Sequence, residues 1–472
     1  MADRELPFTP VSHLAHLLRE RKLSPVELVQ AYLERIDRID GKVKAFITIC
    51  REKALAAARD AEREITRGRY IGPLHGVPIG MKDQFNTRGI RTTMGSNIYS
   101  EHIPQEDATV VQRLKQAGAI ILGKLNMTEF AFGDTRRYPY GTPRNPWDPD
   151  RSPGMSSSGS GIAVAAALSA ATIGEDTGGS VRLPAAMCGV VGIRPTYGRV
   201  SRHGIFPMCW SMDSAGPMTR TVEDCALLLG IISGHDPQDR LSSKLPVPDY
   251  TRGLGAGVKG MRVGYIREHT EAKELDEEIG AAVKQALEVL AGLGAQVEPV
   301  SIPLASLAGP IYIAICDSDA AEVHHKLLRV RAKEYDAATR TRLFAASLLP
   351  AILYHRAQRA RELLRRQMLE AVKDLDVLVS PVTSAPPPTL AEAARPLESE
   401  ADVRARIFGA RFYTIPYSLA GLPAVSVPCG FTKTGLPIGL QIGGKAFDEA
   451  TVLRVAAAYE SATDWYTRRP DL

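Results

Sequence analysis

Residues 151–194 read RSPGMSSSGSGIAVAAALSAATIGEDTGGSVRLPAAMCGVVGIR. Two clusters of glycine and small hydroxylated residues, at 154–161 and 176–180, flank an alanine-rich run. Glycine lets backbone N–H groups approach a ligand and serine supplies hydroxyls, so the clusters predict a site with its own backbone geometry. A flexible linker is the alternative. It is disfavoured because the stretch also predicts an apolar helix at 162–171 and a buried strand at 190–193.

Helix and strand signals alternate on both sides of this stretch. Ser24 and Glu27 form a capping box with proline at the first helical position, and Gly118 ends a predicted helix just before a short strand. Alternation of this kind predicts a mixed sheet covered by helices. The other predicted strands are 43–49, 119–122, 261–266, 296–300, 377–379, 425–427 and 438–442, and the other helices are 53–66, 221–232, 276–293 and 448–459.

Strand signals near both ends of the chain favour one sheet assembled from the whole length. We therefore predict a single α/β domain over residues 1–472, with a central mixed β-sheet flanked by helices on both faces. N-terminal helices are expected at about residues 1–65. A helical excursion is expected at about residues 310–375, where it would shape the substrate pocket.

The composition is that of an ordinary globular protein: 44% of the 472 residues are hydrophobic and 24% are charged. A net charge of +5 is too small to predict binding to nucleic acid or to an anionic membrane. The six cysteines are scattered without C-x-x-C spacing, which favours reduced thiols. The first residues lack the apolar core of a signal peptide, and no apolar run reaches the roughly 18 residues of a spanning helix. We expect a soluble, cytoplasmic protein.

Several common catalytic motifs are absent from the sequence. There is no G-x-S-x-G elbow, no S-x-x-K, no phosphate-binding G-x-x-x-x-G-K-[ST] and no H-E-x-x-H. The adjacent His324 and His325 are interpreted as a surface pair rather than as metal ligands.

The motif D-T-G-G-S-V-R at 176–182 is the remaining candidate. Consecutive N–H groups around its two glycines can converge on one point, as in an anion nest or an oxyanion hole. Ser180 can act as a nucleophile there if a base removes its proton. Lys82 is the candidate base, because it follows the apolar run V-P-I-G-M and burial lowers the pKa of a lysine. The alternative is that Lys82 pairs with the adjacent Asp83 at a surface turn.

Five segments, taken together and in this order, resemble the amidase signature family. They are GPLHGVPIGMKD, GKLNMTEFAFG, YGTPRNPWDPDRSPGMSSSGSG, GEDTGGSVRLPAAMCGVVGIRPTYGRVSR and YTIPYSLAGLPAVSVPCGF. The resemblance covers residues 72–133, 140–232 and 412–460. It implies a many-stranded mixed sheet flanked by helices.

The resemblance implies a Ser-cis-Ser-Lys triad on Ser180, Ser156 and Lys82. Ser180 would attack the carbonyl carbon, and Ser156, at an unusual cis peptide bond, would relay its proton to neutral Lys82. A non-proline cis bond costs about 3–4 kcal/mol and persists only where its surroundings enforce it. The mechanism needs no cofactor and no metal.

The resemblance also implies supporting residues around this triad. Expected oxyanion donors are the N–H groups of Thr177, Gly178, Gly179 and Ser180. Expected organisers of the loop are Asp176, Arg182 and Ser157, and expected pocket residues are Ala131 and Phe132. The chain departs from the family pattern at Met155 and Ser158, where glycines are usual, and at Glu175, where threonine is common. For Glu175 a structural or solvated carboxylate is favoured over a catalytic one.

One member of the family is the ammonia-releasing A subunit of a tRNA-dependent glutamine amidotransferase, which supplies a partner protein. Its glutamine site uses an acidic residue shortly before T-I-P and an arginine in a helical R-I-x-L-G motif. This chain has Arg411 near the first position and no R-I-x-L-G motif at 310–375. A zwitterion would lack its charged partners, so we predict a stand-alone hydrolase and keep the amidotransferase role as the alternative.

The residues expected around the pocket are apolar and aromatic, at 131–132, 205–210 and 311–313. They favour a small apolar or aryl amide or carbamate as the substrate, with esterase and urethanase activity left open. Core packing is the alternative for any one of them. The only expected partner is this small molecule, without nucleic acid or membrane, and a homodimer is left open. A non-catalytic anion-binding module is the remote alternative, which a serine-reactive fluorophosphonate would distinguish by not labelling Ser180.

Overall fold

One mixed sheet organises the protein. The structure is a computed structural model in which residues 5–133, 137–395, 398–403 and 413–472 are described. The described strands form an 11-stranded sheet in the order β1-β3-β2-β4-β6-β5-β10-β11-β9-β7-β8. They are β1 (Phe46–Ile49), β2 (Pro78–Lys82), β3 (Ile120–Leu125), β4 (Ala171–Glu175), β5 (Val191–Arg194), β6 (Ala215–Thr219), β7 (Arg262–Ile266), β8 (Gln296–Val300), β9 (Val377–Pro381), β10 (Ala424–Phe431) and β11 (Pro437–Gly444). The predicted α/β fold with a central mixed sheet is confirmed.

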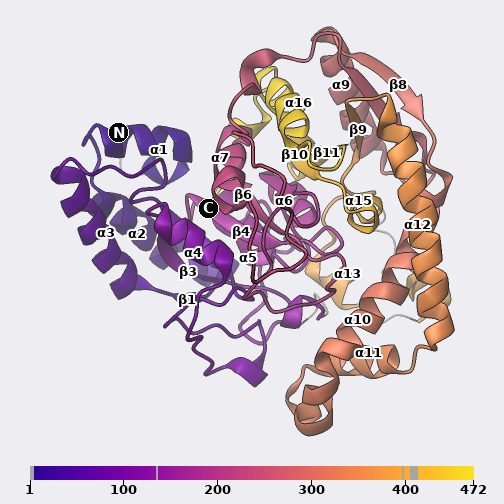
Figure 1. The fold of residues 1–472 in the computed structure, drawn as a ribbon, viewed down its shortest axis with the longest axis horizontal. Coiled ribbons are helices and arrows are strands. Elements are labelled where there is room, and N and C mark those ends of the chain that lie inside the picture. The colour runs from indigo at the N-terminus through magenta and orange to yellow at the C-terminus, as the bar shows by residue number, and fades with distance from the viewer. Residues whose placement is uncertain (1–4, 134–136, 396–397, 404–412) are drawn as a thin grey trace.

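Helices cover this sheet and extend beyond both of its ends. They are α1 (Val11–Arg19), α2 (Pro25–Val43), α3 (Arg51–Thr66), α4 (Thr109–Gln116), α5 (Ser158–Ala165), α6 (Arg182–Cys188), α7 (Val222–Ile232), α8 (Arg267–Thr270), α9 (Glu277–Gly292), α10 (Ala308–Arg331), α11 (Ala337–Ser347), α12 (Ala351–Lys373), α13 (Leu390–Ala394), α15 (Ile415–Ala420) and α16 (Glu449–Ser461). The capping box at the start of α2 is present as predicted. Helices α1–α3 lie at one end of the molecule and α10–α12 at the other (Figure 1).

The two faces of the sheet carry different side chains. On β11, Ile438 and Leu440 join the large apolar core, in which α9 and α16 also bury side chains. The intervening Gly439 lies on the opposite face, where a Cβ atom would stand 2.5 Å from the Ala186 side chain of α6. A larger residue would push α6 away from the sheet. Glycine therefore lets α6 pack directly against the strands.

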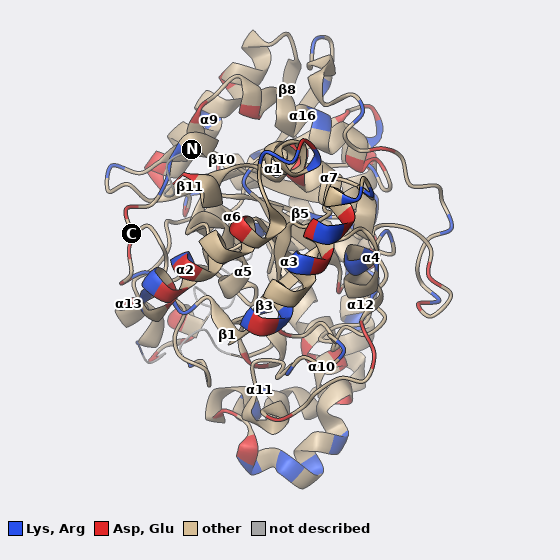
Figure 2. Ribbon diagram, turned by 90° about the vertical axis from the view of Figure 1, so that its left-hand side faces the viewer, with Lys and Arg blue, Asp and Glu red and all other residues tan. Residues whose placement is uncertain are grey.

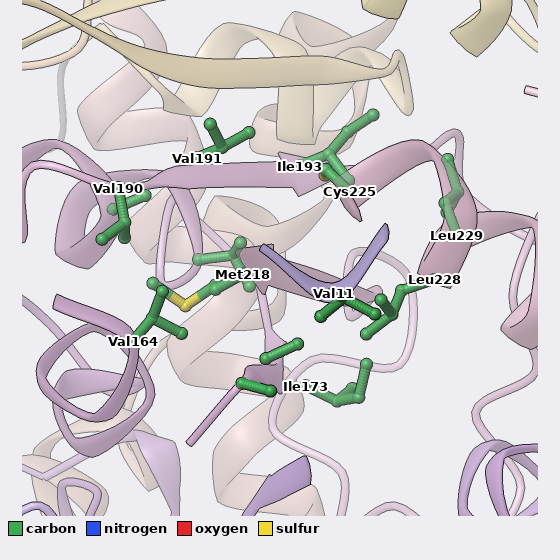
Figure 3. Close-up of a cluster of buried hydrophobic side chains, with 14 of the residues drawn as sticks. Val11, Val164, Ile173, Val190, Val191, Ile193, Met218, Cys225, Leu228 and Leu229 are labelled. Atoms are coloured by element: carbon green, nitrogen blue, oxygen red, sulfur yellow. The ribbon is translucent and has the colours of Figure 1, made fainter. Parts of the chain in front are cut away.

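The main core fills the space between the middle strands and the helices beside them. Figure 3 shows Val164 of α5, Ile173 of β4 and Met218 of β6 grouped together, with Val11 and Leu228 nearby. Charged residues gather instead on the outer surfaces of helices such as α2, α3 and α4 (Figure 2). None of the described helices is long and apolar enough to cross a membrane.

Strands β2 and β4 place the two chemically unusual parts of the chain side by side. They are parallel neighbours, with Met81 opposite Ile173, so their carboxyl ends meet at the same edge of the sheet. Strand β2 ends at Lys82. Strand β4 ends at Glu175 and leads directly into the D-T-G-G-S motif, after which α6 begins.

Candidate active site

Lys82 and Ser156 lie together at this edge. The Nζ atom of Lys82 is 2.8 Å from Ser156 Oγ, and it donates to the main-chain oxygen and to Oε2 of Glu175, each at 3.2 Å. All three residues are buried. Burial lowers the pKa of Lys82 below its ordinary value, although the Glu175 carboxylate opposes the shift. The geometry is that of an amine facing a hydroxyl in a site shielded from water.

The alternative pairing of Lys82 with Asp83 at a surface turn is wrong. Asp83 is fully buried, and its partners are Thr93, which donates through its backbone N–H at 2.8 Å, and Lys124, whose Nζ is 3.5 Å away. Lys82 contacts Ser156 and Glu175 instead, so the two neighbouring residues have different partners.

Ser180 lies at the end of the D-T-G-G-S motif, two residues before α6 begins. Its exposed fraction is 9%, against 1% for Ser156 and 0% for Lys82. Its hydroxyl makes no hydrogen bond to another described residue. Of the three predicted triad residues it is therefore the one that a substrate reaches most easily.

The predicted cis peptide bond at Ser156 is not present. No bond in the described part of the chain is cis. The Ser156 Oγ atom contacts Lys82 with a trans bond at this position.

Asp176 holds the D-T-G-G-S loop in shape. Its carboxylate accepts from the backbone N–H groups of Gly179 at 2.8 Å and Val181 at 3.2 Å, and from the Arg182 guanidinium at 2.9 and 3.0 Å. Burial alone would raise the pKa of Asp176, but Arg182 and Arg194 outweigh it and hold that pKa below its usual range. Arg182 also donates to Thr414 O at 2.8 Å, and this hydrogen bond connects the loop to the start of α15.

The hydrogen bond from Gly179 to Asp176 occupies one of the predicted oxyanion donors. The Gly179 N–H already donates to Asp176, whereas the N–H groups of Thr177, Gly178 and Ser180 donate to no described residue. These three groups therefore fit the predicted oxyanion role better than Gly179 does. Gly179 also has a φ of +123°, which favours glycine, and a Cβ atom there would collide with Thr414.

Ser157 joins the serine loop to the end of β4. Its hydroxyl donates to Glu175 O at 3.1 Å, and the Ser157 Oγ atom accepts from the Glu175 N–H at 3.3 Å. Ser157 also precedes α5, so the helix that follows Ser156 is anchored to the strand that leads to Ser180. This contact is where the two small-residue clusters of the sequence meet.

Two further side chains belong to this site that the sequence analysis did not assign to it. The Thr177 hydroxyl lies 2.7 Å from Glu175 Oε1 and 2.7 Å from Asp213 Oδ1. Burial, followed by the charge of Glu175, raises the pKa of Asp213 to about 7. The departure of Glu175 from the family pattern was the only signal in the sequence for this part of the site. Asp213 stands in no motif, and the sequence carried no signal for it.

The predicted apolar pocket is for the most part a packed core. Ala131, Phe132, Met208 and Tyr312 belong to one cluster of buried side chains, whereas Trp210 is 52% exposed. A packed cluster does not indicate the polarity of a substrate. Tyr312 nevertheless lies beside the loop, because a Cβ atom on Gly178 would stand 2.8 Å from its hydroxyl oxygen.

A charged pair also lies beside Phe132. Arg342 of α11 stacks on the Phe132 ring at 3.8 Å and donates to Phe132 O at 3.1 Å. Its guanidinium also donates to both carboxylate oxygens of Asp317, at 2.5 and 3.2 Å. Burial opposes the charge, but Asp317 outweighs it and raises the pKa of Arg342. Arg411, which the sequence analysis placed where an acidic residue was expected, lies outside the described residues.

Comparison with known proteins gives the family. Residues 27–453 match the family described as Amidase. The chain is 40% identical to the A subunit of glutamyl-tRNA(Gln) amidotransferase from Geobacter sp. (strain M21), covering 98% of this chain and 99% of the relative. It is 42% identical to the protein of the same name from Moorella thermoacetica, covering 99% of each.

Solved structures agree with this assignment. The A subunit of glutamyl-tRNA(Gln) amidotransferase from Thermotoga maritima superposes with a TM-score of 0.83 at 32% identity, covering 97% of this chain and 96% of that one. A 6-aminohexanoate cyclic dimer hydrolase superposes with a TM-score of 0.89 at 29% identity, covering 98% and 99%.

These comparisons correct two predictions. A stand-alone hydrolase for apolar or aryl amides and carbamates is wrong, because the relatives that are about 40% identical over the full length are A subunits of an amidotransferase. A small molecule as the only partner, without nucleic acid, is wrong for the same reason, since the name of these relatives includes glutamyl-tRNA(Gln). Most of the apolar residues behind the first prediction are core residues. The chain belongs to the amidase family and is an enzyme that hydrolyses carbon–nitrogen bonds.

Proposed function

We propose that this chain is the glutamine-hydrolysing A subunit of a tRNA-dependent amidotransferase. The observation that carries the proposal is the identity of about 40% with such A subunits over nearly the whole length of both chains. The bond broken is then a linear amide, the side-chain carboxamide of glutamine. The ammonia released would pass to a partner protein that acts on glutamyl-tRNA(Gln).

The proposed mechanism uses Ser180, Ser156 and Lys82. Neutral Lys82 takes the Ser156 proton while Ser156 takes the proton of Ser180, whose oxygen attacks the carboxamide carbon. The N–H groups of Thr177, Gly178 and Ser180 hold the oxyanion, and each such donor is worth about 3 kcal/mol in the transition state. The relay then protonates the leaving ammonia. Water releases glutamate from the acyl-enzyme by the same route.

Glutamine is a zwitterion, and a pair of opposite charges suits its two charged ends. Arg342 offers a planar guanidinium for the α-carboxylate, and Asp317 offers a carboxylate for the α-ammonium. Arg342 lies beside Phe132. Asp317 lies on α10, the helix that also carries Tyr312, which is next to the D-T-G-G-S loop. Arg342 begins the helical run R-L-F-A-A, so the R-I-x-L-G motif sought in the sequence is too strict a signal for this role.

The test is glutamate release from glutamine. The purified chain is assayed alone and together with the other subunits of the Moorella thermoacetica amidotransferase and glutamyl-tRNA(Gln). We expect glutamate release in the assembled enzyme and none with Ser180→Ala. Arg342→Gln should raise KM for glutamine by about tenfold or more, because it removes a bidentate contact to a carboxylate.

Labelling by a fluorophosphonate serves as the control, because that probe has no α-carboxylate. Arg342→Gln should label at the parent rate, and Arg356→Gln on the exposed side of α12 should change neither measurement. A parent chain that labels at Ser180 but releases no glutamate with all subunits present would contradict the proposal.

A further inference from the structure

The contacts of the Lys82 amine fit both of its protonation states. Its three partners are Ser156 Oγ, Glu175 O and Glu175 Oε2. An ammonium group donates to all three. A neutral amine has two protons and one lone pair, so it donates to the two Glu175 oxygens and accepts from the Ser156 hydroxyl. Glu175 therefore holds the amine in place whether or not it carries the extra proton.

The Thr177 hydroxyl links this carboxyl group to a second one. It lies 2.7 Å from both Glu175 Oε1 and Asp213 Oδ1. A hydroxyl has one proton and can donate to only one acceptor, so the other carboxyl group must donate to the Thr177 oxygen. At these distances Glu175 and Asp213 therefore share one acidic proton between them, as two buried carboxyl groups with like charges do.

The charged groups around this cluster come from five segments of the chain. Lys82 faces Glu175 from the end of β2, and Asp213 faces it from the segment before β6. Asp176 follows Glu175 directly, but Arg182 and Arg194 already neutralise it. Asp213 also accepts from the N–H groups of residues 208 and 209, which hold its carboxyl group in place. The charge that faces Lys82 is thus decided mainly by where the shared proton lies.

We propose that Glu175 is a positioning residue that holds the Lys82 amine against Ser156 and, through Thr177, shares one proton with Asp213, which sets the charge that Lys82 meets. This proposal rests on the Lys82–Ser156–Ser180 site of the proposed function. It does not depend on glutamine as the substrate.

The proton count of the step is balanced. Before attack Lys82 is a neutral amine, Glu175 is ionised, and the shared proton lies on Asp213. The Ser180 proton passes to Ser156 as the Ser156 proton passes to Lys82, which becomes an ammonium beside the Glu175 carboxylate. When the leaving group departs, Ser156 gives it the proton that came from Ser180, and Ser156 takes its own proton back from Lys82, which is neutral again. No other group gains or loses a proton.

The experiment follows fluorophosphonate labelling of Ser180 in the full chain as a function of pH. Glu175→Gln keeps the size of the side chain and one acceptor oxygen, replaces the other oxygen by an NH2 donor, and removes the charge. The labelling rate falls at acidic pH, where Lys82 is protonated, and this part of the profile is its acidic limb. The acidic limb should move to lower pH by about one unit or more, because an amine without a nearby carboxylate loses its proton more easily. The plateau should fall about ten- to hundredfold, because the ammonium formed during attack loses its charged partner.

Three further variants separate this role from a structural one. Glu175→Asp retains the charge and should keep the limb near its parent position. Asp213→Asn cannot exchange the shared proton. Its acidic limb should therefore have the slope of a single proton, whereas the acidic limb of the parent should be steeper. Glu460→Gln makes the same chemical change at a carboxyl group that accepts from Val222 N, and should leave the profile unchanged.

An unshifted limb in Glu175→Gln, or an equal shift in Glu175→Asp, would overturn the proposal. If Glu175→Gln fails to fold, the slope of the Asp213→Asn limb decides instead, and an unchanged slope contradicts the shared proton. Labelling reads Ser180 directly. A parent chain that labels but does not hydrolyse glutamine would therefore contradict the proposed function and leave this test intact.

Discussion

Two fully buried lysines stand next to each other in the sheet and differ in what surrounds them. Lys82 ends β2, and Lys124 lies on the adjacent parallel strand β3. Each has a buried carboxyl group within reach, Glu175 at 3.2 Å for Lys82 and Asp83 at 3.5 Å for Lys124. Burial lowers the pKa of both, that of Lys124 to about 8. Burial and an acidic neighbour therefore do not distinguish a base from a structural cation.

The hydroxyl partner makes the difference. Lys124 donates at 2.7 Å to Thr92 Oγ1, whose own proton goes to Ile90 O at 3.0 Å. Its other hydrogen bond goes to Phe85 O, which can only accept, and Asp83 lies 3.5 Å away, so no described hydrogen-bond partner of Lys124 can give it a proton. By contrast, Ser156 has no other described acceptor for its proton. Its hydroxyl is free to donate to Lys82, and only that arrangement allows a lysine to act as a base.

The largest expected effect is on activity at Lys82. Lys82→Met should reduce Ser180 labelling and glutamine hydrolysis by about a thousandfold, within the range usual for loss of a general base. Stability should also fall, because the buried Glu175 loses its cationic partner. Labelling rates and urea unfolding of the same preparations measure both effects. If Lys82→Met labels at the parent rate, Lys82 is not the base and the proposed difference between the two lysines is wrong.

The second effect is on stability at Lys124. Lys124→Met leaves Asp83 buried without its cation, which costs about 3–5 kcal/mol of unfolding free energy. Labelling per folded molecule should stay close to that of the parent, because Lys124 touches neither serine. Adding Asp83→Asn should recover part of the loss. A Lys124→Met protein that is stable but does not label would reverse the two assignments.

The sequence predicted one lysine of this pair and not the other, for a reason that lies in strand length. The strand predicted at 119–122 ends before Lys124, whereas β3 continues to Leu125. Apolar patterning does not predict polar residues at the end of a buried strand. Such residues can be buried only where another part of the fold supplies a partner for them. The same limit left Lys82 with two interpretations, since the choice between Asp83 and a distant partner depends on which strands are neighbours.

Other parts of the chain could be predicted because their signals are local. The capping box at Ser24 and the strand Gln296–Val300 are present as predicted, since each depends on residues close in sequence. The proton-sharing partner Asp213 could not be predicted. It meets Thr177 across 36 positions without a motif. The apolar residues near Tyr312 were interpreted as a pocket because apolar composition alone cannot separate a pocket from a core.

The third effect is a dependence on pH. The pKa of Lys124 is about 8 in the folded protein and about 10.4 when unfolded, so between these values the unfolded chain binds more protons. Stability gained from this group therefore rises with pH across that range. The difference in unfolding free energy between the parent and Lys124→Met should widen by about 2–3 kcal/mol from pH 8 to pH 10. A constant difference would show that Lys124 is not titrating there.

The smallest expected effects on stability concern the hydroxyl partners themselves, and they test the comparison most directly. Thr92→Val keeps the shape of the side chain but leaves one ammonium proton of Lys124 without an acceptor, which should cost about 1–2 kcal/mol of stability with little change in labelling. Ser156→Ala removes the matching hydroxyl from Lys82. A neutral amine tolerates that loss, so stability should change by about 0.5 kcal/mol or less while labelling nearly stops. Unfolding in urea and labelling rates of both variants suffice. If Ser156→Ala destabilises the protein as much as Thr92→Val does, Lys82 is an ammonium in the resting protein and its hydroxyl partner is an acceptor, as at Lys124.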